Sequence, residues 1–189
     1  MNSHDYSRTG TLPPRFRELM QGCREMVRSH LVPLFQGLLE NGDIALLELA
    51  TVVDGWWSDL TRTRAAGAAK PEDLEKWDVV VGAQQAAIGA IRPGVPSNQV
   101  DKAARDPIVK AGLGQYFIHH TGHGVGLRYH EPQPFLHPDV VTPLEAGMVS
   151  SVEPGIYIEG WGGMRCEDNI LVTDSGVEVL SEFSRRLDG

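Results

Sequence analysis

Residues 119–131 read HHTGHGVGLRYHE and place four histidines and one glutamate within 13 residues. The glycines between them, Gly122, Gly124 and Gly126, carry no Cβ and let side chains and backbone approach a crowded centre closely. Neutral imidazole is a common metal ligand and an acid or base near neutral pH. The stretch therefore suggests a metal-centred active site, whereas the alternative is a solvated histidine loop that binds metal only incidentally.

The segment before this stretch is predicted to be helical scaffold. Pro71 opens a helix that Arg92-Pro93-Gly94 closes, and Ser97 caps a shorter helix that Pro107 should kink or end. Residues 116–118 are expected to form a strand that leads into the histidines. The apolar stripe of the first helix comprises Leu74, Trp77, Val81, Ile88 and Ile91. This stripe is interpreted as core rather than as a binding surface.

A hairpin is predicted farther upstream, after the turn signal Asn41-Gly42-Asp43. Residues 44–53 form an apolar run interrupted by Glu48, and residues 56–61 follow an Asp-Gly turn and carry Asp59. Glu48 and Asp59 can therefore face the same space. A carboxylate inside an apolar strand is costly unless it is paired or bound to a cation. The alternative to a metal ligand is a salt bridge, with Arg62 or Arg64 as the partner.

A second hairpin is predicted downstream. Residues 147–152 read as a strand that ends at Glu153, and residues 164–172 read as a strand that carries Glu167. Two acids at facing ends of a hairpin repel each other unless a cation lies between them.

The two hairpins and the histidine stretch together supply four carboxylates and one imidazole: Glu48, Asp59, His123, Glu153 and Glu167. Oxygen-rich sites with a nitrogen donor suit manganese, cobalt, iron or zinc, and bridging carboxylates can hold two metals about 3.5 to 4 Å apart. The reaction class that this set indicates is metal-assisted hydrolysis.

Four blocks of the chain resemble the pita-bread metallopeptidases, which include methionine aminopeptidase, aminopeptidase P and prolidase. The blocks are GDIALLELATVVDGWWSDLTRT from Gly42, HHTGHGVGLRYHE from His119, GMVSSVEPGIY from Gly147 and GMRCEDNILVTDSG from Gly163. The resemblance implies an α+β fold, with a curved antiparallel sheet, helices on its outer face and metal ions in its concave face.

The same resemblance implies a set of metal ligands. These would be Asp59, His123, Glu153 and Glu167, with Glu48 at the position of the family's first aspartate. They would hold two divalent ions, manganese or cobalt first, with zinc or iron also fitting. Because glutamate is one methylene longer than aspartate, Glu48 could weaken the first ion's site or leave a mononuclear enzyme.

Further residues are implied to act on the substrate. Glu153 would move a proton from the attacking metal-bridging hydroxide to the leaving amine. His130 matches the histidine that contacts the substrate carbonyl, and His30 matches an upstream histidine that faces the scissile peptide. His119 and Arg165 match positions that line the site in the proline-directed branches, although Arg165 could only pair with an acid and His119 could only buttress the loop.

The function that this resemblance implies is a metal-dependent exopeptidase that removes the N-terminal residue of short peptides, with Xaa-Pro peptides as the first candidates. One alternative keeps the fold with other chemistry, as a C–S lyase or a creatinase-like hydrolase. Another is an inactive remnant or binding module.

Composition limits the partners. Hydrophobic residues make up 41% and charged residues 22%, and the 17 basic and 25 acidic residues give a formal charge of −8. This balance argues against nucleic acid or an anionic membrane as the main partner. The short peptide expected as substrate is implied by the resemblance. No apolar run reaches membrane length, and Cys23 and Cys166 form no framework, so a cytoplasmic setting is expected.

A flexible leader over residues 1–14 and a single catalytic domain over residues 15–189 are predicted, with a helix from Phe16 to near His30. The resembling family has more chain before the position of His30, so a truncated or minimal first half is expected. A homodimer is left open.

Overall fold

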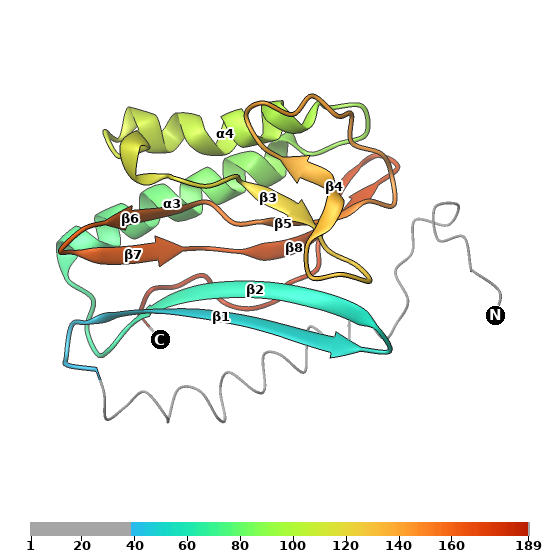
Figure 1. Ribbon diagram of the computed structural model, residues 1–189. Coiled ribbons are helices and arrows are strands. Elements are labelled where there is room, and N and C mark those ends of the chain that lie inside the picture. Colours follow the sequence, from blue (N-terminus) through green and yellow to red (C-terminus); the bar gives the residue numbers. More distant parts are fainter. Residues whose placement is uncertain (1–38, 189) are drawn as a thin grey trace.

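The computed structural model describes residues 39–188 and shows an α+β architecture in this part of the chain, as the sequence predicts (Figure 1). The predicted leader, the helix from Phe16 and His30 lie outside the described residues. None of the described helices is both long enough and apolar enough to span a membrane. The elements are β1 (Ile44–Val53), β2 (Trp56–Ala65), α3 (Pro71–Ala90), α4 (Ser97–Lys110), the 3₁₀ helix η3 (Gly114–Tyr116), β3 (Gly122–Gly124), β4 (Glu131–Leu136), β5 (Val149–Val152), β6 (Gly155–Ile158), β7 (Gly162–Arg165), β8 (Asp168–Thr173) and β9 (Gly176–Val179).

The hairpin β1–β2 confirms the first predicted hairpin. Asp54 and Gly55 at its turn have φ angles of 52° and 86°, the left-handed conformation that a tight two-residue hairpin turn requires. In the register, Glu48 lies opposite Thr61, and Asp59 lies opposite Ala50. Because residues two apart on a strand share a face, Glu48, Asp59 and Thr61 all project from the same side of the hairpin.

The central sheet has the strand order β4-β3-β5-β8-β9. Its crowded middle depends on two glycines of the histidine stretch. A Cβ on Gly122 would lie 2.1 Å from the carbonyl oxygen of Ser151, and a Cβ on Gly124 would lie 2.1 Å from that of Gln133. Only glycine therefore lets β3 lie between its two neighbours at this distance.

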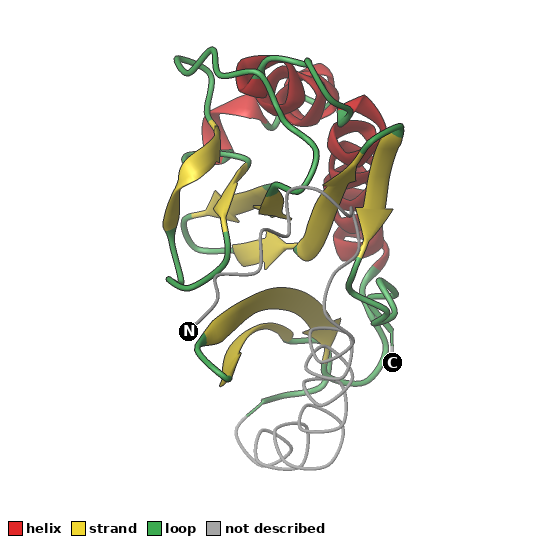
Figure 2. Ribbon diagram, turned by 90° about the vertical axis from the view of Figure 1, so that its right-hand side faces the viewer, coloured by secondary structure: helices red, strands yellow, loops and turns green. Residues whose placement is uncertain are grey.

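The two long helices cover one side of the strands, whereas the hairpin β1–β2 lies on the opposite side of the molecule (Figures 1 and 2). The predicted apolar stripe of α3 is only partly correct. Trp77 and Ile91 are buried, but Leu74 is 39% exposed, and the small residues Ala83 and Ala87 are fully buried instead. Their small side chains allow α3 to pack closely on its neighbours, which turns a different face of the helix inward.

The structure corrects two local expectations about α4. The helix does not end at Pro107, which lies inside the last turn, and it continues to Lys110. Near the helix end, the missing N–H of proline removes only one hydrogen bond. Ser97 is the first helical residue and does not cap the helix; its hydroxyl donates to the carbonyl of Val140 at 2.6 Å. Pro96 occupies the cap position.

The strand expected at residues 116–118 is also absent from the described chain. The backbone forms η3 and then an irregular segment. The carbonyls of Phe117 and His119 accept hydrogen bonds from the Arg105 guanidinium on α4, at 3.0 and 2.9 Å, instead of from a neighbouring strand. Arg105 thus holds the segment that precedes the histidine stretch.

The strand expected over residues 164–172 is divided into β7 and β8. Val152 of β5 pairs with Asp168 of β8, and Gly155 of β6 pairs with Arg165 of β7. The gaps between these two ladders contain Glu153 on one side and Glu167 on the other. The predicted facing of these two acids across a hairpin is therefore confirmed.

Candidate metal centre

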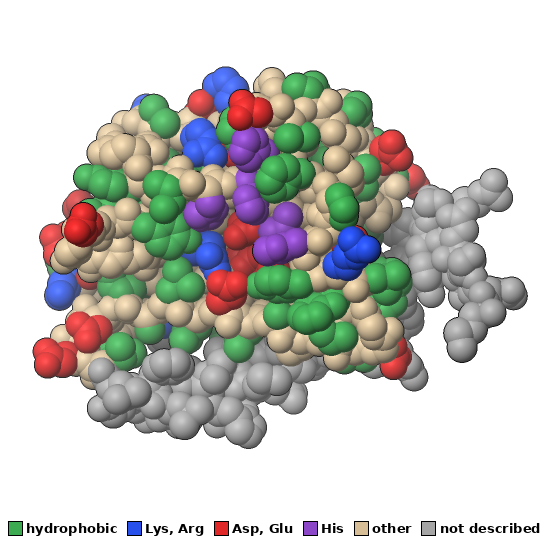
Figure 3. All heavy atoms as spheres, viewed as in Figure 1, with side chains coloured by type: hydrophobic (Ala, Val, Ile, Leu, Met, Phe, Trp, Pro, Cys, Tyr) green, Lys and Arg blue, Asp and Glu red, His purple; other side chains and the backbone are tan. Residues whose placement is uncertain are grey.

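The described candidate ligands come from five different segments and converge on one face of the molecule. Figure 3 shows histidine side chains gathered in the middle of this face, next to acidic side chains. Strand β1 contributes Glu48, β2 contributes Asp59, and β3 contributes His123. Glu153 follows β5 directly, and Glu167 precedes β8 directly.

His123 is held with one ring nitrogen directed at the acids. Its Nδ1 lies 2.9 Å from the carbonyl oxygen of Gly124, so Nδ1 carries the proton and donates it to that oxygen. Its Nε2 lies 3.4 Å from Asp59 Oδ2 and 3.3 Å from Glu153 Oε1. Burial opposes a positive charge on the ring, but these two carboxylates outweigh burial and raise the pKa of His123 to about 10. A backbone carbonyl that fixes the tautomer in this way is typical of metal-ligating histidines.

Glu167 provides the clearest sign of a cation. The residue is 1% exposed, and its Oε2 accepts a hydrogen bond from the Thr61 hydroxyl at 2.5 Å. Its Oε1 is buried and has no hydrogen-bond partner among residues 39–188. Burial and then the charges of Glu153 and Asp59 raise the pKa of Glu167 well above its usual range. A divalent ion would satisfy the free oxygen and neutralise the repulsion, so the donor set fits a metal.

Asp59 and Glu153 complete the buried acidic set. Burial, opposed by the hydrogen bond to His123, raises the pKa of Asp59. For Glu153, burial has the same tendency, but the hydrogen bond and charge of His123 outweigh it and lower the pKa. Two groups of three residues could each hold a metal ion, because one ligand atom from each residue of the group lies within 4.8 Å of the others. They are Asp59 with His123 and His130, and His120 with His123 and Glu153.

Glu48 lies at the same centre but is engaged by other side chains. Its Oε1 accepts a hydrogen bond from the Tyr129 hydroxyl at 2.7 Å, and its Oε2 accepts one from the Arg165 guanidinium. The salt bridge weighed for Glu48 therefore exists, but its partner is Arg165. Arg62 pairs with the buried Asp168 instead.

Arg165 joins the acids to the aromatic wall of the site. Its Nε donates to the Thr61 hydroxyl at 3.0 Å, and Nη1 donates to the Tyr157 hydroxyl at 3.3 Å. The Tyr157 hydroxyl lies 3.0 Å from His119 Nε2, and His119 Nδ1 donates to the carbonyl of His120 at 2.7 Å. Nε2 of His119 is then an acceptor, and burial lowers the pKa of this ring. His119 is thus a neutral, fixed part of the wall.

His130 is exposed and lies directly over the centre. Its ring centroid is 4.0 Å from that of His123, and it stacks on Tyr129 with centroids 4.7 Å apart. This position leaves His130 on the open side of the centre, where a substrate could contact it.

Sequence reasoning did not assign a role to several residues that the structure places at the centre. They are Thr61, His120, Tyr129, Ser151 and Tyr157. The Ser151 hydroxyl donates to Glu153 Oε1 at 2.9 Å. Thr61 follows Asp59 by two positions, and Ser151 precedes Glu153 by two, so alternation along a strand was a usable signal for both. Tyr157 has no comparable local signal, because its partner Arg165 lies on the next strand.

Comparisons with known proteins agree with this geometry. Residues 5–174 match the model of metallopeptidase family M24. The chain is 40% identical over 182 residues to an Xaa-Pro dipeptidase of Lactobacillus helveticus, covering 94% of this chain and 48% of that protein. The chain thus spans about half the length of the curated relatives that it matches.

Solved structures of peptidases are also similar to this chain. The prolidase of Pyrococcus horikoshii is 39% identical with a TM-score of 0.76, over 79% of this chain and 43% of that one. The X-Pro aminopeptidase of Thermotoga maritima is 32% identical with a TM-score of 0.77, over 80% of this chain and 43% of that one. The expected pita-bread fold is confirmed by these neighbours. The chain belongs to metallopeptidase family M24.

Proposed function

We propose that this chain forms the catalytic part of a metal-dependent exopeptidase that removes the N-terminal residue of short peptides, with Xaa-Pro peptides as the preferred class. The observation that carries the proposal is the buried Oε1 of Glu167, which has no hydrogen-bond partner among residues 39–188 and lies near the charges of Glu153 and Asp59, the two acids that contact His123. The names of the relatives, Xaa-Pro dipeptidase and X-Pro aminopeptidase, support the substrate class. The absence of a cysteine framework supports a cytoplasmic setting.

Two divalent ions, manganese or cobalt first, would be held by Asp59, His123, Glu153 and Glu167, with Glu48 as the fifth ligand. Bound divalent ions supply an activated water and polarise the scissile carbonyl.

The other residues of the chain would position and protonate the substrate. Glu153, with Ser151 holding one of its oxygens, would take the proton of the attacking water and give it to the leaving amine. His130, exposed above the centre, would donate to the scissile carbonyl. His119 and Arg165, joined through Tyr157, would form the wall against which the residue after the scissile bond packs. His30 is proposed to face the scissile peptide.

The test is release of the N-terminal amino acid from Ala-Pro and Ala-Pro-Gly after incubation with manganese and after treatment with a chelator. We expect cleavage that depends on manganese and falls by about 10² to 10⁴ in the Glu153→Gln variant. Glu182→Gln, at an exposed position in the C-terminal segment, is the control and should retain full activity.

Absence of metal-stimulated cleavage across a varied peptide set, in protein that takes up metal, would refute the peptidase. Cleavage of a C–S bond by the same sample would then favour the lyase alternative. A folded sample that takes up no metal would favour an inactive remnant.

A further inference from the structure

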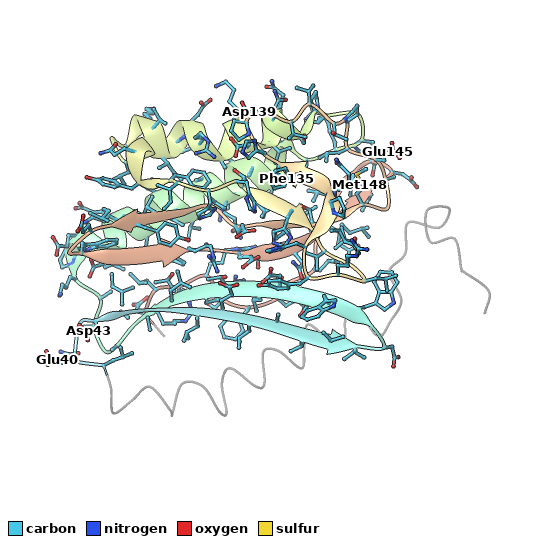
Figure 4. All side chains as sticks on the ribbon, viewed as in Figure 1. Glu40, Asp43, Phe135, Asp139, Glu145 and Met148 are labelled. Carbon is cyan, nitrogen blue, oxygen red and sulfur yellow. The ribbon has the colours of Figure 1, made fainter. Side chains whose placement is uncertain are left out.

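A cavity of about 570 Å³ opens beside the candidate metal centre. Its volume falls within the range of about 300 to 1,000 Å³ that is typical of ligand pockets. Phe135, labelled in Figure 4, lies on β4, the strand that contacts α4. The cavity is lined chiefly by Arg105, Phe117, His119, His120, Phe135 and His137.

The cavity adjoins the centre, because His119 and His120 line the cavity and also contact residues of the centre. Nε2 of His120 lies 3.9 Å from Glu153 Oε1, and the rings of His120 and His123 have centroids 5.9 Å apart. His119 contacts Tyr157, which accepts a hydrogen bond from Arg165. A molecule bound at the centre can therefore extend into the cavity while it stays in contact with the protein.

The wall of the cavity is a row of flat rings. His120 and Phe135 have ring centroids 4.8 Å apart, and Phe135 and His137 stack with centroids 5.2 Å apart and an angle of 12°. His137 Nδ1 accepts the backbone N–H of Asp139, so that nitrogen carries no proton. Rings of this kind favour another flat apolar ring, which gains both area burial and ring contacts.

The charged groups around the cavity do not favour a charged side chain over an aromatic one. Among the described residues, the one guanidinium in the lining belongs to Arg105, and it is already neutralised by Asp101 through contacts of 2.8 and 2.9 Å. None of the carboxylates of residues 39–188 lines the cavity. A charged substrate group would lose water there without gaining a partner.

The wall of the site sets the direction of the peptide. In the proposed exopeptidase the scissile bond lies at the centre, and the residue after it packs against His119 and Arg165. Because His119 also lines the cavity, the next residue of the peptide lies toward the cavity. We propose that this cavity is a specificity subsite for the third residue of the peptide and favours an aromatic side chain there. This inference rests on the proposed exopeptidase function.

The experiment compares kcat/KM for Ala-Pro-Phe and Ala-Pro-Gly, with manganese present. The two peptides have the same length and the same scissile bond, so their ratio reports only the third side chain. We expect the enzyme to prefer Ala-Pro-Phe by about tenfold or more, the discrimination that an apolar pocket gives. The ratio of the two kcat/KM values should fall toward one in the Phe135→Ala variant and in the His137→Ala variant.

Val141→Ala is the matched control, because Val141 lies in the same loop as His137 but is 68% exposed and does not line the cavity. It should keep the full preference. Phe135 pairs with His123 in the sheet, so its variant could disturb the centre; His137 lies outside the strands and tests the cavity separately. Manganese uptake by each variant shows whether the centre is intact.

The outcomes separate the two proposals. Cleavage of both peptides at equal kcat/KM by the unmodified protein would overturn the subsite and leave the exopeptidase standing. A preference that survives both cavity variants would also overturn it. Cleavage of Ala-Pro but of neither tripeptide would overturn the subsite alone. If Ala-Pro also remains uncleaved in protein that takes up manganese, both proposals are overturned.

Discussion

Glu48 is the residue at which this chain departs from the ligand pattern that its family resemblance implies. Its side chain is 43% exposed, whereas Asp59 and Glu167 are buried. Both of its oxygens accept hydrogen bonds, from Tyr129 and Arg165. A metal ion at Glu48 must therefore share the carboxylate with these donors, and we expect it to bind more weakly than an ion held by His123.

Metal stoichiometry tests this residue. We expect the unmodified protein to retain two manganese ions per chain after removal of excess metal, and Glu48→Gln to retain one, because the amide has nearly the same shape without the charge. The Tyr129→Phe variant should still retain two manganese ions, but its affinity for manganese should be weakened by about 10-fold or more, because the phenol only holds the carboxylate of Glu48 in place. Elemental analysis and titration calorimetry measure both effects. One ion in the unmodified protein, unchanged in Glu48→Gln, would remove Glu48 from the ligand set.

At the scale of elements, the segment after β9, residues 180–188, connects the elements that carry the candidate ligands. Arg185 forms an ion pair of 2.6 Å with the fully buried Asp168 of β8, and its carbonyl accepts the indole N–H of Trp77 on α3 at 2.7 Å. The Arg62 guanidinium on β2 donates to the carbonyl of Phe183 at 2.9 Å and to Asp168. Asp168 directly follows the candidate ligand Glu167, so this network fixes the position of that ligand.

Adjacent arginines in this segment provide a matched pair. Arg185→Ala should lower the free energy of unfolding by about 1 to 3 kcal/mol, because Asp168 loses one charged partner but keeps Arg62 and Gln84. Arg186 is 72% exposed in its pair with Asp188, so Arg186→Ala should change stability by less than about 1 kcal/mol. Urea denaturation of the metal-free proteins measures the difference. Equal losses in the two variants would contradict the role of Arg185.

For the whole molecule, stability and metal binding are linked through protons. The pKa of Glu167 in the folded protein is raised above its ordinary value of 4.5, so its contribution to stability is present below about pH 4.5 and is lost as the pH rises toward the raised pKa. The pKa of His123 is raised from 6.5 to about 10. Its contribution to stability is therefore present below about pH 6.5 and is lost as the pH rises through about 10. Metal-free protein therefore loses both contributions on going to alkaline pH.

Divalent ions should reverse this loss, because they replace the protons on the same groups. We expect manganese at about 100 times its Kd to stabilise the fold at pH 8 by about 2.7 kcal/mol, and the effect to fade toward pH 5. Melting temperatures with and without manganese across this pH range measure it. Asp59→Ala should abolish the shift. A shift of equal size in that variant would mean that manganese stabilises the protein elsewhere.

The sequence by itself determined the features that depend on near neighbours in the chain. The Asp54-Gly55 turn and two-residue alternation put Glu48 and Asp59 on one face of a hairpin. The glycines around His123 predicted close approach, and the structure shows it at Gly122 and Gly124. These features follow from local sterics and hydrogen bonding, which act over a few residues.

Only the tertiary structure decided which distant side chains meet. Arg165 pairs with Glu48 across 117 positions, and Tyr129 reaches Glu48 across 81, although neither contact leaves a periodic signal in the sequence. The exposure of Leu74 on α3 and the irregular backbone near Phe117 have the same origin. Long-range packing selects among local conformations and partners of similar energy, so it overrides local preference at these places.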